Sequence, residues 1–270
     1  MTWDAVLIAG PTAGGKSALG LSLARACNGA IVNADSMQVY AELRVLTARP
    51  DAARDADIAH DLYGHVSVTE RYSVGRYAVE AAEALSRVKS KGKLPIFVGG
   101  TGLYFEALLS GLSPVPSVSA DVRARVRARF DAMGREAFTR ELIARDPATA
   151  RIRVSDTQRL LRAADVLEAT GRPLSQWQSV PGVPVLEHAK TLRLVLSPPR
   201  DALNARIAER VERMIEEGAI EEARSLAGLD PTLPAAKALG VPQLQNVLGG
   251  TGTIEEAIAL TQQDRKSTRL

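Results

Sequence analysis

The chain is poor in the residues that form cross-links or hold metals. Its 270 residues include one cysteine, Cys27, and three histidines, which excludes an intrachain disulfide and leaves no recognisable zinc site. Cys27 falls in the apolar pattern of the first predicted helix, so we expect a small buried hydrophobic residue in a reducing cytoplasm. No apolar run has the length that crosses a bilayer, and no basic-then-apolar leader precedes the first strand. We therefore expect a cytoplasmic protein without a membrane partner.

Lysine is absent from a long basic segment in the middle of the chain. Residues 121–172 hold twelve arginines, no lysine and eight acidic residues, a net charge of +4, whereas the whole chain has +3. Arginine suits contacts with phosphates and planar bases, which indicates a nucleic-acid surface. The competing interpretation is a solvated helical surface with many ion pairs, and composition alone favours it.

A phosphate-binding loop is the most informative motif that is present. An apolar run at residues 5–9 leads into a glycine-rich loop, and a helical pattern follows at residues 18–26. The loop has the complete G-x-x-x-x-G-K-S spacing, and its backbone N–H groups are expected to surround a polyphosphate. Its residues are Gly10, Pro11, Thr12, Ala13, Gly14, Gly15, Lys16 and Ser17. In this motif the lysine contacts the terminal phosphate oxygens, and the serine hydroxyl is a ligand of Mg²⁺.

Strand and helix patterns alternate on both sides of a helical stretch. Strands are predicted at residues 30–33, 94–98 and 192–196, and helices at residues 74–91, 103–109 and 201–217. Proline-rich breaks at residues 113–117 and 180–184 enclose a segment with helical patterns only. We therefore predict an α/β fold with a P-loop NTPase-like parallel sheet flanked by helices. The predicted core comprises residues 1–113 and 186–270, and the predicted all-helical insertion domain comprises residues 114–185.

Three turns are expected to meet at one edge of this sheet, because each follows a parallel strand. They are the phosphate loop, the turn at Asp35 and a second glycine-rich turn that contains Thr101. A kinase could use this set, with Asp35 accepting a proton from a substrate hydroxyl. A transferase with a diphosphate leaving group could use it equally well, and a non-catalytic nucleotide-binding module is a third possibility.

The residues within these turns closely resemble the bacterial tRNA dimethylallyltransferases, also called isopentenyl-diphosphate:tRNA transferases. The matching segments occur in family order and span roughly residues 5–250. They are residues 10–17, Asp-Ser-Met-Gln-Val-Tyr at 35–40, Thr-Ala-Arg-Pro at 47–50, Tyr-Ser-Val-Gly at 72–75, the segment 95–104 with Val-Gly-Gly-Thr-Gly-Leu-Tyr, Asp-Thr-Gln-Arg at 156–159, and residues 206–218. The segments at 35–40 and 98–104 are far more specific than the phosphate loop.

The resemblance implies transfer of a dimethylallyl group from dimethylallyl diphosphate to N6 of the adenosine 3′-adjacent to the anticodon of tRNA. Asp35 would then be the general base, although an N-cap or a Mg²⁺-supporting role is its alternative. Thr101 would hydrogen-bond at the reaction centre, with simple turn chemistry as the alternative. The diphosphate would be held by the loop, by Mg²⁺ on Ser17, and by either Arg206 or Arg210. We expect a monomer.

The same resemblance assigns residues to the RNA. An anticodon-loop base must leave its stack to reach the crevice. Ser36, Met37 and Gln38 would line its pocket; Gln38 is able to make a bidentate contact with adenine, and core packing is the alternative for Met37. Positions matching family contacts with tRNA are Arg123, Gln158, Arg159 and Arg162.

Two segments depart from the family pattern. Residues 44–50 read Arg-Val-Leu-Thr-Ala-Arg-Pro where the family commonly has Asp-Ile-Gly-Thr-Ala-Lys-Pro. Residues 264–270 do not match the basic, aromatic segment that the family normally has there. This second departure raises the hypothesis of a truncated sequence with a foreign tail.

Overall fold

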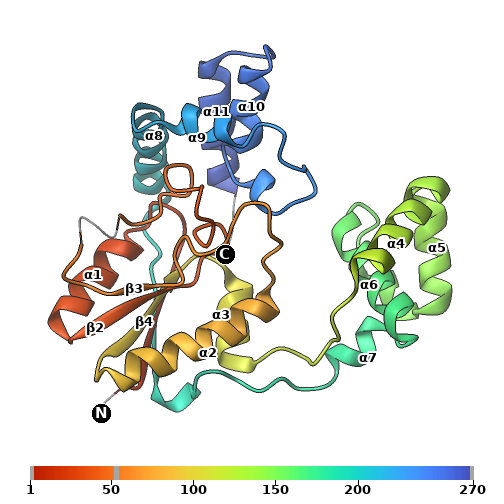
Figure 1. Cartoon of the computed structure of the whole chain (residues 1–270), viewed down its shortest axis with the longest axis horizontal. Helices are drawn as coiled ribbons and strands as arrows, with labels where there is room; N and C mark the ends of the chain where they lie inside the picture. The colour runs from red at the N-terminus through yellow and green to blue at the C-terminus, as the bar shows by residue number, and fades with distance from the viewer. Residues whose placement is uncertain (1–2, 52–54, 268–270) are drawn as a thin grey trace. The chain divides into compact units, whose positions relative to one another are not determined.

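A parallel five-stranded sheet forms the centre of the larger part of the chain (Figure 1). The computed structural model describes residues 3–51 and 55–267. The strands lie in the order β3-β2-β4-β1-β5 and pair in parallel throughout. They are β1 (Ala5–Ala9), β2 (Gly29–Asn33), β3 (His60–Asp61), β4 (Leu94–Gly99) and β5 (Thr191–Val195). The predicted P-loop-like α/β fold is therefore confirmed.

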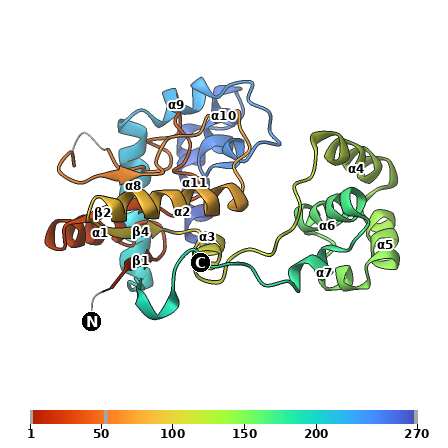
Figure 2. The ribbon, with the colours of Figure 1, turned by 60° about the horizontal axis from the view of Figure 1, so that its bottom comes forward.

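Helices cover both faces of the sheet (Figure 1 and Figure 2). Alternate residues of the strands bury against the helices of opposite faces. On one face, Val6, Ile8 and their equivalents pack on α1 (Lys16–Ala26). On the other face, Leu7, Val32 and Phe97 join a cluster with α2 (Val74–Ser90) and α3 (Gly102–Ser110). This period of two is that of strands buried on both faces, and it explains their nearly continuous apolar sequences.

Helices complete this unit after β5. The 17-residue helix α8 (Arg200–Glu216) is followed by shorter helices, and the predicted strand at 192–196 and helix at 201–217 lie within one residue of the observed elements. The remaining elements are α9 (Ala219–Ser225), η3 (Ala235–Lys237), α10 (Val241–Leu248) and α11 (Ile254–Ser267), with η2 (His188–Lys190) before β5. Part of the segment 264–270 that departs from the family lies in α11, and residues 268–270 lie outside the described residues.

The helical insertion forms a separate compact unit. Contacts divide the chain into residues 1–109 with 185–270, and residues 110–184, so the boundaries lie a few residues from those expected. The second unit contains α4 (Ala120–Met133), α5 (Arg135–Arg145), η1 (Pro147–Arg151), α6 (Thr157–Thr170) and α7 (Leu174–Gln178) (Figure 2). Its own core joins Val126 and Phe130 of α4 to Phe138 of α5 and Leu160 of α6.

The structure corrects one expectation from the sequence. Cys27 is exposed rather than buried, because it follows the last residue of α1 as its C-cap, in the short turn that precedes β2. The apolar pattern of the helix ends at Ala24, which is buried. Among the helices that the structure describes, none is both long and apolar enough to cross a membrane.

Candidate active site

The phosphate loop has the conformation of an anion-binding turn. Ala13 and Gly15 adopt positive φ angles of 57° and 90°, and the N–H of Gly14 donates to the carbonyl of Pro11 at 3.1 Å. Helix α1 begins directly afterwards, and no side chain caps it. Its first N–H groups are therefore available to an anion at the positive end of the helix.

Lys16 is folded back onto the loop. Its Nζ donates to the carbonyls of Gly10 at 2.9 Å and Pro11 at 2.7 Å. The pKa of Lys16 is lowered from 10.5 to about 8, mainly by burial and in smaller part by the charge of Arg210, while Asp35 acts in the opposite direction. A bound polyphosphate would offset this loss of hydration, because it supplies negative charge beside the ammonium group.

Thr101 joins the turn after β4 to the turn after β2. The N–H of Ser36 donates to Thr101 Oγ1 at 2.9 Å, and Oγ1 donates to Ser36 Oγ at 3.3 Å. The N–H of Thr101 donates to the carbonyl of Ala34 at 3.3 Å. Thr101 therefore connects the turn after β4 to the turn after β2, which carries Asp35.

The carboxylate of Asp35 is held by one oxygen. Asp35 Oδ1 accepts from the N–H of Met37 at 3.0 Å. No hydrogen bond to Oδ2 occurs among the described residues, and this oxygen faces Gly100. Residues 36–40 form a turn and not a helix, so the Oδ1 contact is a local turn bond and not the N-cap of the alternative interpretation, and it leaves one oxygen available for a proton.

Two glycines allow close approach at this edge of the sheet. A Cβ on Gly99 would overlap the carbonyl group of Ala34, so β4 tolerates no side chain there. A Cβ on Gly100 would lie 3.5 Å from Gly10 O, 3.6 Å from Asp35 Oδ2 and 3.9 Å from Lys16 Nζ. The free carboxylate oxygen and the ammonium group therefore lie around one point in space.

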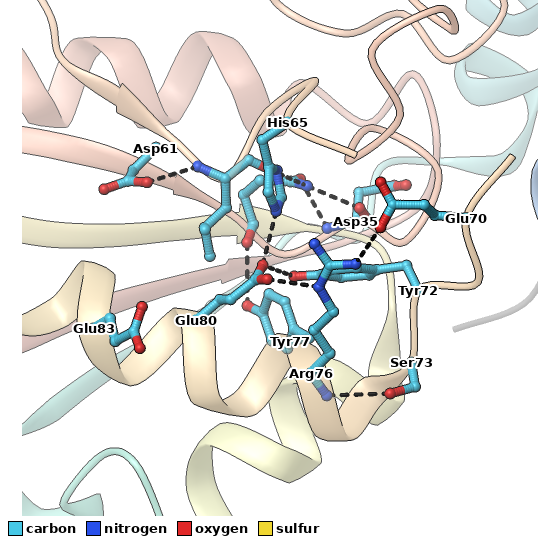
Figure 3. A network of polar contacts seen from close by, with 12 residues as sticks. Asp35, Asp61, His65, Glu70, Tyr72, Ser73, Arg76, Tyr77, Glu80 and Glu83 are labelled. Atoms are coloured by element: carbon cyan, nitrogen blue, oxygen red, sulfur yellow. Dashed lines mark hydrogen bonds and ion pairs between the residues drawn. The ribbon is translucent and has the colours of Figure 1, made fainter. Parts of the chain in front are cut away.

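A polar network supports the Asp35 turn from helix α2 (Figure 3). Tyr77 donates to the backbone carbonyl of Asn33 at 3.1 Å. Glu80 accepts from Tyr72 at 2.6 Å and from Arg76 at 2.7 Å, and its carboxylate lies 2.8 Å from His65 Nε2. Burial acts to raise the pKa of Glu80, but these three hydrogen bonds outweigh it and lower that pKa. The network fastens the loop before α2, through His65 and Tyr72, to Glu80 of α2.

The loops surround a cavity of about 460 Å³. It brings together Asp35, Thr101 and every predicted residue of the phosphate loop. The other lining residues are Ala18, Ser36, Met37, Gln38, Leu46, Thr47, Ala48, Val98, Gly99, Gly100, Arg210, Ala238, Leu239 and Arg265. Met37 also packs against the hydrophobic core, as its alternative interpretation expects, and its contact with an RNA base stays a prediction.

The structure separates the two candidate arginines of α8. Arg210 lines the cavity, and burial lowers its pKa, with Arg213 lowering it further. Arg206 is exposed and does not line the cavity. The apolar spacing distinguishes them, because Ile207, Val211 and Met214 form the buried face and Arg210 lies beside it.

Arg265 of α11 is a cavity residue that sequence reasoning missed. It is 5% exposed, and its Nη2 donates to the carbonyl of Leu46 at 2.6 Å. Its pKa is lowered to about 10, mainly by burial and in smaller part by the charge of Arg210, while Asp35 acts in the opposite direction. Ala257 and Thr261 are also buried, so a stripe at intervals of four residues was the available signal.

Four of the predicted RNA-binding residues lie in the helical unit. Arg123 is on α4, and Gln158, Arg159 and Arg162 are on α6. Arg162 and Arg123 both act to lower the pKa of buried Asp165, although burial raises it overall, so they lie near one carboxylate. Arg159 pairs with Asp156 at 3.3 Å and keeps 77% of its side chain exposed. Other arginines are engaged in ion pairs within the unit, namely Arg127, Arg129 and Arg145.

The residues fit a magnesium ion held largely by a bound phosphate. Within the described part of the chain, no group of three or more His, Cys, Asp or Glu residues could hold a metal. Ser17 lies at the exposed start of α1 and lines the cavity. Mg²⁺ commonly takes few protein ligands and completes its shell with water and phosphate oxygens.

Comparisons with known proteins agree with this geometry. The IPP transferase family model matches residues 38–268, and the isopentenyl transferase model matches residues 3–60. The chain belongs to the IPP transferase family. A protein named tRNA dimethylallyltransferase from Bradyrhizobium sp. (strain ORS 278) is 51% identical over 265 residues, which cover 97% of this chain and 86% of the relative.

Solved structures show the same fold. The full-length tRNA isopentenylpyrophosphate transferase from Bacillus halodurans has 30% identity and a TM-score of 0.65, covering 97% of this chain and 82% of the other. A eukaryotic dimethylallyltransferase acting on tRNA has a TM-score of 0.80 at 24% identity, covering 97% and 67% respectively. This second likeness concerns the fold alone.

Proposed function

We propose that the chain transfers a dimethylallyl group from dimethylallyl diphosphate to N6 of the adenosine 3′-adjacent to the anticodon in tRNA. Membership of the family makes it a tRNA-modifying prenyltransferase, and the small-metabolite kinase alternative is not favoured. The observation that supports the finer proposal is the shared position of Asp35 Oδ2 and Lys16 Nζ around Gly100. A carboxylate and an ammonium group this close together suit a step in which N6 loses a proton while the allylic carbon loses its diphosphate.

The donor side of the reaction needs a stabilised leaving group. The bond between the allylic carbon and the diphosphate oxygen breaks, and its electron pair goes to the diphosphate. The N–H groups of the loop, Lys16 and Arg210 would stabilise that charge as it develops. Mg²⁺ held through Ser17 would supply further charge stabilisation when bound.

The acceptor side needs a proton acceptor. The N6 lone pair of adenine is delocalised into the ring, so the amine attacks well only if its proton is removed as the new N–C bond forms. Asp35 Oδ2 is available for that proton, while Oδ1 is fixed by Met37. Thr101 holds Ser36 and thereby fixes the turn that carries this base.

The test is transfer of labelled dimethylallyl from its diphosphate to unmodified tRNA in the presence of Mg²⁺. Wild-type protein is expected to label the RNA, and Asp35→Asn is expected to reduce kcat by about a hundredfold or more, since positioned general bases contribute 10²–10⁴. Turnover of ATP without RNA would instead support the kinase, and binding without any transfer would support a non-catalytic module.

We also propose that the protein acts in the cytoplasm as a monomer. A single exposed cysteine is compatible with a reducing compartment. Light scattering during size-exclusion chromatography, in reducing buffer, tests the oligomeric state.

A further inference from the structure

A carboxylate far along the chain holds the loop on one side of the cavity. Glu222 of α9 accepts three backbone N–H groups: Arg44 at 2.9 Å and Val45 at 2.8 Å on Oε2, and Leu46 at 2.9 Å on Oε1. No ion pair with Glu222 occurs in the described part of the chain, so this carboxylate is held by backbone dipoles. Hydrogen bonds from N–H groups to a charged acceptor are about twice as strong as neutral ones.

The loop that Glu222 holds determines the orientation of Gln38. Gln38 Nε2 donates to the carbonyls of Thr47 at 2.9 Å and Ala48 at 3.2 Å. Two carbonyl partners fix which end of the amide is nitrogen, and they use both of its hydrogens. No hydrogen bond to Gln38 Oε1 occurs among the described residues, and Gln38 lines the cavity. The amide of this cavity-lining residue therefore has a free acceptor and no free donor.

An acceptor at this position distinguishes purines by their exocyclic group. Adenine carries an amino donor at C6, whereas guanine carries an oxygen acceptor there. The bidentate contact expected from the sequence needs the Nε2 hydrogens, and these are engaged by the loop. Adenine can donate one amino hydrogen to Gln38 Oε1 and direct the other at Asp35 Oδ2. Guanine cannot, because it has an oxygen at C6.

We propose that Glu222 is a positioning residue for selection of the acceptor base, acting through residues 44–48 and the Gln38 amide. The inference rests on the proposed function. Replacing Glu222 by glutamine removes the charge and turns an amide NH₂ toward backbone N–H groups that need an acceptor. The loop then loses its anchor, and Gln38 loses the carbonyls that orient it.

The neighbouring residue provides a matched control. Glu221 lies on the same short helix, keeps 68% of its side chain exposed, and forms an ion pair with Arg224 at 3.9 Å. Glu221→Gln removes the same charge from the same helix without touching the loop. Any difference between Glu221→Gln and Glu222→Gln therefore reports the loop contact.

The experiment measures kinetics of transfer to anticodon stem-loops and binding of stem-loops with adenosine or guanosine at the acceptor position. Glu222→Gln is expected to lower kcat/KM for the adenosine RNA by about tenfold, mainly through KM, and to reduce its binding preference for adenosine to the same degree. The affinity of Glu222→Gln for pyrophosphate is expected to stay within about twofold of wild type. For Glu221→Gln, the kcat/KM, the adenosine preference and the pyrophosphate affinity are all expected to stay within this range. The double variant Gln38→Ala with Glu222→Gln is expected to have nearly the same kcat/KM and adenosine preference as Gln38→Ala alone. The losses are not additive, because Glu222 acts through Gln38.

Equal behaviour of Glu222→Gln and Glu221→Gln, or fully additive losses in the double variant, would overturn the inference. If Glu222→Gln does not fold, Glu222→Asp keeps the charge on a shorter side chain and is expected to lose part of the adenosine preference. The binding preference is measurable without catalysis. Absence of transfer by wild type would refute the proposed function, while an unchanged preference in the Glu222 variants would refute this inference alone.

Discussion

The side chain of Asn33 holds the backbone of Asp35 on both sides. Asn33 Oδ1 accepts from the N–H of Asp35 at 2.9 Å, and Nδ2 donates to the Asp35 carbonyl at 2.9 Å. Nδ2 also donates to the carbonyl of Leu62 at 3.1 Å, where the chain has a positive φ of 62°. Asn33 is fully buried, so water does not replace these contacts.

Asn33→Ala is therefore expected to lower kcat while leaving affinity for pyrophosphate unchanged. Loss of the clamp lets the Asp35 turn shift, and a displacement of about 1 Å at a reacting group costs on the order of a hundredfold in rate. The buried polar groups left without partners are also expected to reduce stability by about 1–3 kcal/mol. Thermal unfolding and single-turnover transfer measure the two effects, and unchanged single-turnover rates would contradict the positioning role.

Single alanine substitutions of the adjacent residues Gly99 and Gly100 are expected to differ, the first reducing stability and the second reducing transfer. Gly99→Ala places a methyl group against the backbone of Ala34 and is expected to destabilise the protein strongly. Gly100→Ala makes only ordinary van der Waals contacts and is expected to fold normally. Its methyl group lies between Asp35 and Lys16, so transfer should be abolished. A Gly100→Ala variant with wild-type transfer would place the reaction elsewhere.

Pyrophosphate affinity is expected to fall as the pH rises above about 8, because Lys16 loses its proton near that pH in the free protein. The sign follows from burial, which lowers the pKa, so the charge is present below the lowered pKa and absent above it. Binding should also take up a fraction of a proton near pH 8. Calorimetry in buffers of different ionisation enthalpy measures this uptake. Lys16→Met serves as the control for titration of pyrophosphate itself, and an identical pH profile in that variant would contradict the assignment.

Removing Arg210 is expected to weaken pyrophosphate binding by about tenfold or more, since a hydrogen bond to a charged group contributes about 1.5–3 kcal/mol. Arg206→Ala, one helical turn away and outside the cavity lining, is expected to leave this affinity unchanged. Isothermal titration with pyrophosphate and Mg²⁺ compares the two variants. A larger loss in Arg206→Ala would reverse the choice between them.

The double variant Arg159→Ala with Arg162→Ala is expected to weaken tRNA binding and to reduce its salt dependence, while pyrophosphate binding stays constant. Each phosphate contact contributes nearly one unit to the slope of log K against log salt for duplex regions. Arg127→Ala with Arg140→Ala removes equal charge from the same unit and is the control. Similar losses in both pairs would mean that general charge, and not these positions, supports binding.

Much of the catalytic edge could be predicted because it depends on local sequence. A parallel strand followed by a turn places that turn at one sheet edge, so the loop at 10–17, Asp35 and Thr101 were predicted to converge, and all line one cavity. The apolar period separates Arg210 from Arg206 in principle, but both lie on a helix whose packing partner is not apparent from one sequence. The insertion boundaries followed from proline-rich breaks.

The contacts that could not be predicted join distant segments. Glu222 meets residues 44–46 across more than 170 residues, and no local pattern indicates which carboxylate fills that site. Arg265 reaches the cavity from a segment that departs from the family pattern, and Cys27 was misplaced because an apolar periodicity does not mark the residue at which a helix ends.

The strand order has a consequence for the chemistry. Asp35 follows β2, Thr101 follows β4 and the anion-binding turn follows β1. These three strands are consecutive neighbours in the sheet. Neighbouring strands lie about 4.8 Å apart, a distance set by backbone pairing and insensitive to side chains. Under the proposed function, backbone pairing in the sheet therefore sets the distance between the strand that carries the proton acceptor and the strand that leads into the diphosphate site, and substitutions of strand side chains leave that distance unchanged.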